Sequence, residues 1–264
     1  MPRSRNLADS ATQGGVPDPG TIFGLTLSRA SATTFQIAVG TARNEDAGTA
    51  RALVLASALT KSLSAFAAGN NNGGLDTGSV ATNTWYHVHL IRRDSDGAID
   101  ALYSLSATTP TMPSGWTARR RLGSIRTDGS SQITPFVQNN DVFTWDTPVS
   151  DLNVTNPGTA AVTRTLTVPT GVIVYPVVSW QVVAAASTAV GLLVTPLTIA
   201  DTAPSTTLTT VRARIASASG GEVAAVVSDI PTNTSAQVRT RCDSSSASDV
   251  LRATTLGWID TRGH

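Results

Sequence analysis

Cysteine is almost absent from this chain of 264 residues, in which Cys242 stands alone. A single cysteine excludes an internal disulfide framework and a metal site built from several cysteines, and it fits assembly in a reducing compartment. The strand pattern of residues 238–242 places Cys242 on the same face as Val238. We therefore expect a core thiol rather than a reactive one.

Charge is also scarce. Charged residues make up 14% of the chain, against roughly 25% in an average soluble domain, and the formal net charge is +1. Lysine occurs only as Lys61, and the remaining basic residues apart from histidine are arginines. A balance so close to neutral gives no strong attraction to nucleic acid, so we expect no nucleic-acid partner.

Long apolar runs are missing as well. No segment approaches the ~20 apolar residues of a membrane helix, so we expect no membrane insertion. The first 20 residues, MPRSRNLADSATQGGVPDPG, lack the apolar stretch of a secretion signal, and we expect a chain made without export. Their glycines, prolines and polar side chains predict an extended arm, residues 1–20, that docks on a partner.

Serine and threonine, by contrast, supply about a quarter of the residues, and the β-branched residues Thr and Val are abundant. This composition favours sheets. The length fits two domains of about 100 to 150 residues, each with its own core. The sequence therefore predicts an all-β fold with two β-sandwich or jelly-roll-like domains, at residues 21–148 and 149–264, after the arm.

Period-two alternation predicts the first strands. FQIAV (35–39) is one, and WYHVHLIRR (85–93) reaches a turn at DSDG and returns as AIDALYSLS (98–106). Asp-Gly between two such runs is a strong hairpin signal. A second hairpin is expected from RRRLGSIRT (119–127) through DGSSQ into ITPFVQ (133–138), with one more strand at DVFTW, residues 141–145.

One short helix is expected within residues 52–67, where Leu55, Leu59, Leu63 and Phe66 recur at helical spacing. Residues 147–160 contain turn residues, two prolines and little apolar periodicity, which places the domain boundary near residue 150. Seven short strands separated by turn residues follow, a pattern typical of a sandwich. They are VTRTLTV, VIVYPVVSWQVV, GLLVTPLTI, TTVRARI, EVAAVVSDI, AQVRTR and DVLRATTLGWI.

The tetrapeptide Asp76-Thr77-Gly78-Ser79 matches the one around the catalytic aspartate of pepsin-like proteases. Those enzymes need two carboxylates that share one proton, and this sequence contains no second Asp-Thr-Gly or Asp-Ser-Gly. The preceding NNNGGL is polar and rich in glycine, where an apolar strand would be required. We interpret Asp76 as a turn residue that accepts hydrogen bonds from nearby backbone N–H groups.

His87 and His89 are two residues apart on an expected strand, so both rings face the same side. With two further ligands, or as three pairs around the axis of a homotrimer, they could hold a transition metal. Packed or hydrogen-bonded histidines are the interpretation that we favour. The only other histidine is His264.

The remaining motifs give no support for catalysis or for a cofactor. The sequence has no Gly-x-Ser-x-Gly elbow and no phosphate-binding glycine loop. Residues 94–97, DSDG, lack the glutamate that closes a calcium loop, so a hairpin turn suffices. The run Arg119, Arg120 and Arg121 could face anionic sugar or phosphate, but a solvated strand edge is the commoner explanation. We expect no enzyme, no cofactor and no metal.

Aromatic residues that stack on sugar rings would mark a glycan-binding module. Four of the five tryptophans, Trp85, Trp145, Trp180 and Trp258, lie in expected strands, where core packing is the default. Trp116, in MPSGWT, is the one expected on a loop, so it is the best candidate for a glycan contact.

Several long motifs carry a resemblance to a known family. They are LTKSLSAFAAGNNNGGLDTGSVATNTWYHVHLIRR, SATTPTMPSGW, RRRLGSIRTDGSSQITPFVQNNDVFTWD and RTLTVPTG, and the likeness extends from about Gly24 to the terminal LGWIDTRG. On these motifs the chain resembles structural proteins of tailed bacteriophages and prophages. The resemblance implies a non-enzymatic component of the virion, assembled in the bacterial cytoplasm. It brings no catalytic residues.

Several roles remain open within that expectation. The first is a homo-oligomeric, naturally trimeric, tail fibre, spike or baseplate protein that attaches to the host and joins other virion proteins through its arm. The second is a capsid decoration protein or head fibre, which needs the same parts. A module that binds host cell-surface glycan is the third, and a hydrolase of host polysaccharide is the least favoured.

Overall fold

The computed structural model describes residues 16–46, 49–186, 188–214 and 220–263. Every regular element in this part of the chain is a β-strand, so it contains no helix that is long and apolar enough to cross a membrane. The expectation of an all-β fold is confirmed. Most of the expected arm, residues 1–15, lies outside the described residues.

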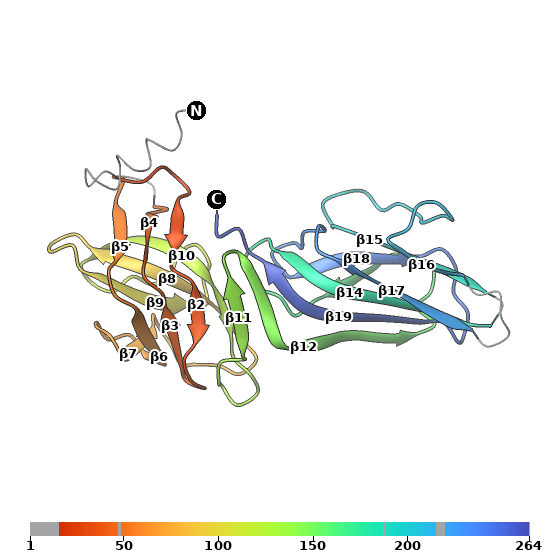
Figure 1. Ribbon diagram of the computed structural model, residues 1–264, viewed down its shortest axis with the longest axis horizontal. Helices are drawn as coiled ribbons and strands as arrows, with labels where there is room; N and C mark the ends of the chain where they lie inside the picture. Colours follow the sequence, from red (N-terminus) through yellow and green to blue (C-terminus); the bar gives the residue numbers. More distant parts are fainter. Residues whose placement is uncertain (1–15, 47–48, 187, 215–219, 264) are drawn as a thin grey trace. The chain divides into compact units, whose positions relative to one another are not determined.

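The chain divides into two compact units (Figure 1). Unit 1 contains residues 1–141 and 261–264, and unit 2 contains residues 142–260. The strands of unit 1 are β1 (Ile22–Gly24), β2 (Leu27–Arg29), β3 (Thr34–Ile37), β4 (Gly40–Arg43), β5 (Ala52–Leu55), β6 (Leu59–Ala65), β7 (Asn72–Leu75), β8 (Trp85–Arg93), β9 (Ile99–Ser104), β10 (Trp116–Arg126) and β11 (Phe136–Asn139).

Unit 1 is built on a seven-stranded sheet in the order β10-β8-β9-β7-β6-β3-β2 and a three-stranded sheet in the order β1-β4-β5. The pairs β6–β7 and β7–β9 are parallel, and the other pairs are antiparallel. The first expected hairpin is confirmed, because β8 and β9 pair around the turn at residues 94–97, with Gly97 at a φ of 72°.

Strand β8 is buried on both faces of the larger sheet. Tyr86, Val88 and Leu90 point to one face, His87 and His89 point to the other, and each is at most 1% exposed. Because the strand is covered on both sides, neither of its faces has to be polar. The two histidines therefore lie in the interior of unit 1.

Unit 2 is a sandwich of two sheets. Its strands are β12 (Val142–Thr155), β13 (Val162–Thr165), β14 (Tyr175–Ala184), β15 (Ala189–Thr195), β16 (Val211–Arg214), β17 (Gly221–Val227), β18 (Gln237–Cys242) and β19 (Val250–Ile259). Within residues 142–260, the strands of one sheet follow the order β12-β19-β14-β17, and those of the other follow the order β13-β18-β15-β16. The seven strands expected beyond residue 160 are all present. In β14, β18 and β19 alternate side chains are buried, so one face of each strand builds the core.

The prediction of a helix within residues 52–67 is wrong. This segment forms β5 and β6, and Leu53, Leu55 and Leu59 are buried along them. The error has a geometric cause. Leu55, Leu59 and Leu63 are four residues apart, and a spacing of four keeps residues on one face of a strand as well as on one face of a helix. Pairing of β5 with β4 and of β6 with β3 and β7 decided the outcome.

Residues 147–160 were expected to separate the domains, but β12 runs through the first part of this segment to Thr155. The expected boundary at 148/149 therefore lies inside a strand. Two register shifts against β19 break the alternation, one between Thr144 and Val149 and one between Ser150 and Leu152. Pro148 falls in the first irregularity, which is where a strand tolerates proline.

The second expected hairpin is wrong in its extent. Strand β10 pairs with β8 along its length, and the segments on either side of DGSSQ share one isolated bridge, Thr127 with Ile133. The turn itself is organised by Asp128, whose Oδ1 accepts the N–H groups of Ser130 at 2.8 Å and of Gln132 at 2.9 Å. A correct turn signal therefore did not imply a ladder on both sides of it.

Candidate binding surface and the buried polar groups

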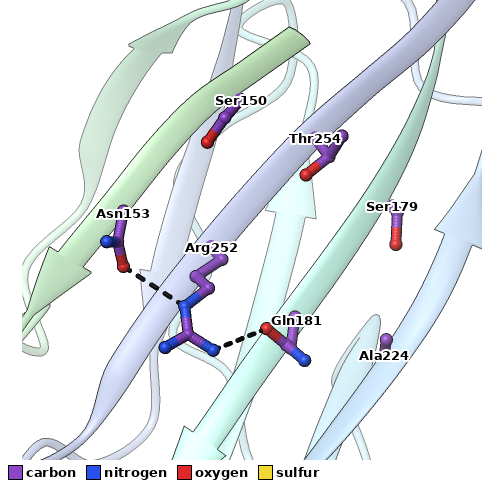
Figure 2. A pocket seen from close by; sticks show the side chains of 7 residues that line it. All are labelled: Ser150, Asn153, Ser179, Gln181, Ala224, Arg252 and Thr254. Atoms are coloured by element: carbon purple, nitrogen blue, oxygen red, sulfur yellow. Dashed lines mark hydrogen bonds between the residues drawn. The ribbon is translucent and has the colours of Figure 1, made fainter. Parts of the chain in front are cut away.

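The outer face of the unit 2 sheet that contains β12, β19 and β14 gathers polar side chains. In β14 and β19 every second side chain is buried, so the residues between them point away from the core. Antiparallel pairing aligns the three strands so that their polar residues form two neighbouring rows. Figure 2 shows these rows side by side, and we call them the polar rows.

The first polar row consists of Ser150, Thr254 and Ser179, which lie opposite one another across β12, β19 and β14. Each offers a hydroxyl group that donates one hydrogen bond and accepts others. Together with the second row and Ala224 of β17, they line a hollow of about 420 Å³. A hollow of this size lies within the range of small-molecule sites, about 300–1,000 Å³.

The second polar row consists of Asn153, Arg252 and Gln181 (Figure 2). Arg252 is central: its Nε donates to Oδ1 of Asn153 at 3.3 Å and its Nη1 donates to Oε1 of Gln181 at 2.9 Å. The carboxylate of Glu222 on β17 lies 3.9 Å from Nη1, and both side chains of this pair are well exposed. The row therefore presents one cation held between two amides.

These groups suit a ligand that is rich in hydroxyl groups. Hydroxyl and amide side chains both donate and accept hydrogen bonds, whereas the guanidinium only donates. The residues that line the hollow include no aromatic ring, so hydrogen bonds rather than ring stacking would hold such a ligand. A saccharide fits this chemistry better than a flat aromatic molecule does.

A half-buried carboxylate, that of Asp151, anchors β12 beside the polar rows. Oδ2 of Asp151 accepts the N–H of Thr167 at 2.9 Å and the hydroxyl of Thr255 at 2.5 Å, and Oδ1 accepts the hydroxyl of Thr167 at 2.6 Å. Asp151 follows Ser150 directly, at the second register shift of β12. These bonds fix the backbone that carries the first polar row.

Asp76 accepts backbone hydrogen bonds as the turn interpretation predicts, but it directly follows strand β7 (Asn72–Leu75), so the expectation that no strand precedes it is wrong. Its Oδ1 accepts the N–H of Thr77 at 2.7 Å, and its Oδ2 accepts the N–H of Thr111 at 2.9 Å. Gly78 follows with a φ of 81°, a conformation that glycine adopts without strain. The protease-like tetrapeptide therefore forms a turn that also ties down the segment around Thr111.

The two histidines are packed and hydrogen-bonded, as the favoured interpretation holds. Nδ1 of His87 lies 3.0 Å from the hydroxyl of Ser124, and Nε2 of His89 donates to the carbonyl of Ser106 at 3.1 Å. Glu45 Oε1 lies 3.7 Å from Nδ1 of His89. Within the described ranges, no group of three or more His, Cys, Asp or Glu side chains is arranged to hold a metal ion.

The arginine run is not a solvated edge, and that interpretation is wrong for two of its members. Arg120 and Arg121 are 3% and 7% exposed, although β10 is the outermost strand of its sheet. Nη2 of Arg120 donates to the carbonyls of Gly20 at 3.0 Å and of Arg262 at 2.9 Å, so chain from both termini covers it. Burial lowers the pKa of Arg120 below its usual value. Arg119 is paired with Asp46.

Trp116 was the best sequence candidate for a glycan contact, and the structure contradicts its expected place on a loop. It begins β10 and is 7% exposed, with the ring of Phe66 edge-on at 6.1 Å and the guanidinium of Arg93 over it at 5.3 Å. Trp145, Trp180 and Trp258 lie in the core of unit 2, as expected.

Cys242 is a core thiol, as predicted. It is 3% exposed and shares the buried face of β18 with Val238. Burial raises the pKa of the thiol to about 11, and the negative charge of Asp243 acts in the same direction. At neutral pH the sulfur is therefore protonated and a poor nucleophile.

Sequence reasoning missed the polar rows and a buried ion pair between Lys61 and Asp100. The alternation that exposes Ser179 and Gln181 is visible in the sequence, but the register that sets Arg252 beside them is not. For Lys61 the available signal was a lone lysine in a segment of Leu, Ala and Ser. No family model matches the chain, and the comparison with curated proteins found no match.

Proposed function

We propose that the chain is a non-enzymatic structural component of a tailed phage particle, of the tail fibre, spike or baseplate kind, that takes part in host attachment. The sequence resemblance supports the virion assignment. The fold alone does not select a function, so the role within the particle has to be argued from a site.

The observation that carries the attachment role is the pair of polar rows. Other side chains that could react or bind a ligand, such as those of Asp76, His87 and Cys242, accept hydrogen bonds in a turn or are buried in a core. The hydroxyl and amide groups of the polar rows instead line an outward-facing hollow, with Arg252 43% exposed. A cell-surface glycan is the ligand class whose hydroxyl groups these side chains complement.

The same proposal includes the partners. A homotrimer would present three copies of the polar rows, and three weak glycan contacts add up to strong binding when one particle engages them together. The N-terminal arm would connect the chain to other virion proteins. A head-fibre or capsid decoration role uses the same parts, and the location of the chain in the particle distinguishes it.

A binding experiment tests the attachment role. Fluorescently tagged chain is added to host cells, and the fraction bound is compared for the unaltered chain and Arg252→Gln. Loss of a charged hydrogen bond costs about 1.5–3 kcal/mol, so we expect binding to weaken about tenfold or more.

Arg241→Gln is the matched control, because Arg241 is also a partly exposed arginine of unit 2 and is paired with Asp201 at 2.6 Å. It lies on β18 in the other sheet, and we expect it to bind like the unaltered chain. Equal binding by both variants would remove the polar rows from the account. No binding by the unaltered chain would remove the attachment role.

A further inference from the structure

The only lysine of the chain is completely buried and lies against a carboxylate. Lys61 and Asp100 have side chains that are 0% and 2% exposed, and Nζ lies 3.0 Å from Oδ1. Nζ also donates to the carbonyls of Ala67 at 2.8 Å and of Gly69 at 3.1 Å. Three acceptors therefore fix the amine in one position, on β6, facing a side chain from β9.

The surroundings are apolar and tightly packed. Phe35 lies opposite Lys61 on β3, and the ring of Phe66 is 5.0 Å from Nζ. Gly74 on β7 packs so closely that a Cβ added there would lie 3.3 Å from Cβ of Lys61 and 3.1 Å from the ring of Tyr103. Burial lowers the pKa of Lys61, while Asp100 acts in the opposite direction. The site thus brings the neutral amine closer in free energy to the charged one.

Asp100 is held by backbone donors on both oxygens. Oδ2 accepts the N–H of Gly69 at 2.7 Å, and Oδ1 accepts the N–H of Ala101 at 2.7 Å. Fixed N–H groups in a buried site stabilise negative charge that develops on an oxygen when a nucleophile adds to the adjacent carbon. The carboxyl carbon is therefore placed as an electrophile beside a fixed amine.

We propose that Lys61 and Asp100 condense to an amide, which joins β6 to β9 by a covalent side-chain cross-link. A proton passes from the ammonium to the carboxylate and leaves a neutral amine and a neutral acid. Nζ forms a bond to Cγ of Asp100, the bond from Cγ to one oxygen breaks, and that oxygen leaves as water with a proton from the amine. The ion pair contains every atom of the amide and the water, and nothing is oxidised or reduced.

Proximity lowers the barrier to the reaction. Nζ lies 3.0 Å from one oxygen of the carboxylate, so the entropy of bringing the two groups together has already been lost in folding. Exclusion of water from the site then protects the amide from hydrolysis. The reaction does not depend on the proposed function, although a cross-linked sheet would serve any protein exposed to mechanical load.

Amine labelling of the unfolded protein tests the cross-link. Because Lys61 is the only lysine, a fully denatured chain offers at most two primary amines, Nζ and the α-amino group. With the cross-link, an amine-reactive ester labels only the α-amino group, and the intact mass before labelling is lower than the sequence mass by one water molecule. Labelling of Lys61 in all of the denatured protein would overturn the proposal.

Peptide mapping locates the loss of water, which a succinimide at an Asp-Gly pair would mimic. Trypsin should leave residues 52–92 uncleaved at Lys61 and joined to residues 94–119. In Asp100→Asn the same amide forms with loss of ammonia, and in Asp100→Ala the full sequence mass returns with Lys61 open to labelling. Separate peptides for residues 52–61 and 94–119 in the unaltered protein would contradict the proposal, whether or not either variant folds.

Discussion

Oε1 of Glu45 lies 3.7 Å from Nδ1 of the fully buried His89, and Oε2 of the same carboxylate accepts the N–H of Arg121 at 3.2 Å. Burial opposes ionisation of Glu45, but the His89 ring, the Arg121 N–H and the nearby Arg120 charge together lower its pKa below 4.5. Folding therefore stabilises the carboxylate form of Glu45 relative to its protonated form.

This relationship predicts how acid affects unit 1. A group whose pKa is lowered by folding stabilises the fold at pH values above its unfolded pKa, and this contribution is lost as the pH falls from about 4.5 through the folded pKa. Glu45→Gln should lower the free energy of unfolding by about 1 kcal/mol at pH 7, and the difference should shrink below pH 4. Urea unfolding at several pH values measures it, and a difference that grows in acid would contradict the assignment.

Trp258 is expected to contribute strongly to the core of unit 2. Its ring stacks on Phe143 with centroids 4.9 Å apart, and Trp145 lies at the same distance on a tilt. Trp258→Ala should lower the free energy of unfolding by about 3–5 kcal/mol because it leaves a large cavity. The matched control is Val226→Ser at an exposed position, which should change it by less than about 0.5 kcal/mol. Denaturant titration that finds similar effects for both would refute this packing.

Trp116 should contribute to the stability of the fold and not to glycan binding. Trp116→Ala removes a buried ring that contacts Phe66 and Arg93, so we expect a loss of about 3 kcal/mol in the free energy of unfolding. Below its lowered melting temperature, the variant should bind host cells as well as the unaltered chain. Reduced cell binding by a variant that circular dichroism shows to be folded would mean that Trp116 contacts the ligand after all.

The thiol of Cys242 should be unreactive in the native state. Its thiol is 3% exposed and its pKa is raised to about 11, so a thiol reagent at pH 8 meets neither an accessible sulfur nor a thiolate. We expect no reaction over minutes in buffer and one thiol per chain in guanidinium. Fast modification of the native protein, measured by absorbance, would show that β18 is open at its end.

The positions of most strands follow from the sequence, because alternation over residues 237–242 or 250–259 has one explanation, a strand covered on one face. The helix prediction for residues 52–67 failed because leucines four residues apart lie on one face of a strand as well as on one face of a helix. The break around Pro148 looked like a linker because a register shift removes alternation without ending the strand.

The candidate surface depends on information that one strand does not contain. Ser150, Thr254 and Ser179 are far apart in the sequence, and only the pairing register makes them a row. The burial of Arg120 likewise depends on carbonyls from Gly20 and Arg262. Sequence patterns assign a residue to a face of its own strand, whereas neighbours from distant segments decide whether that face is exposed to solvent.

The central claim is that the chain is a virion component that acts in host attachment, and its location in the particle tests this most directly. Antibody raised against the purified chain, coupled to gold, is applied to intact particles and viewed by electron microscopy. The account predicts gold at the tail or baseplate. Gold confined to the head would assign a decoration role instead, and particles that contain none of the chain would contradict the account.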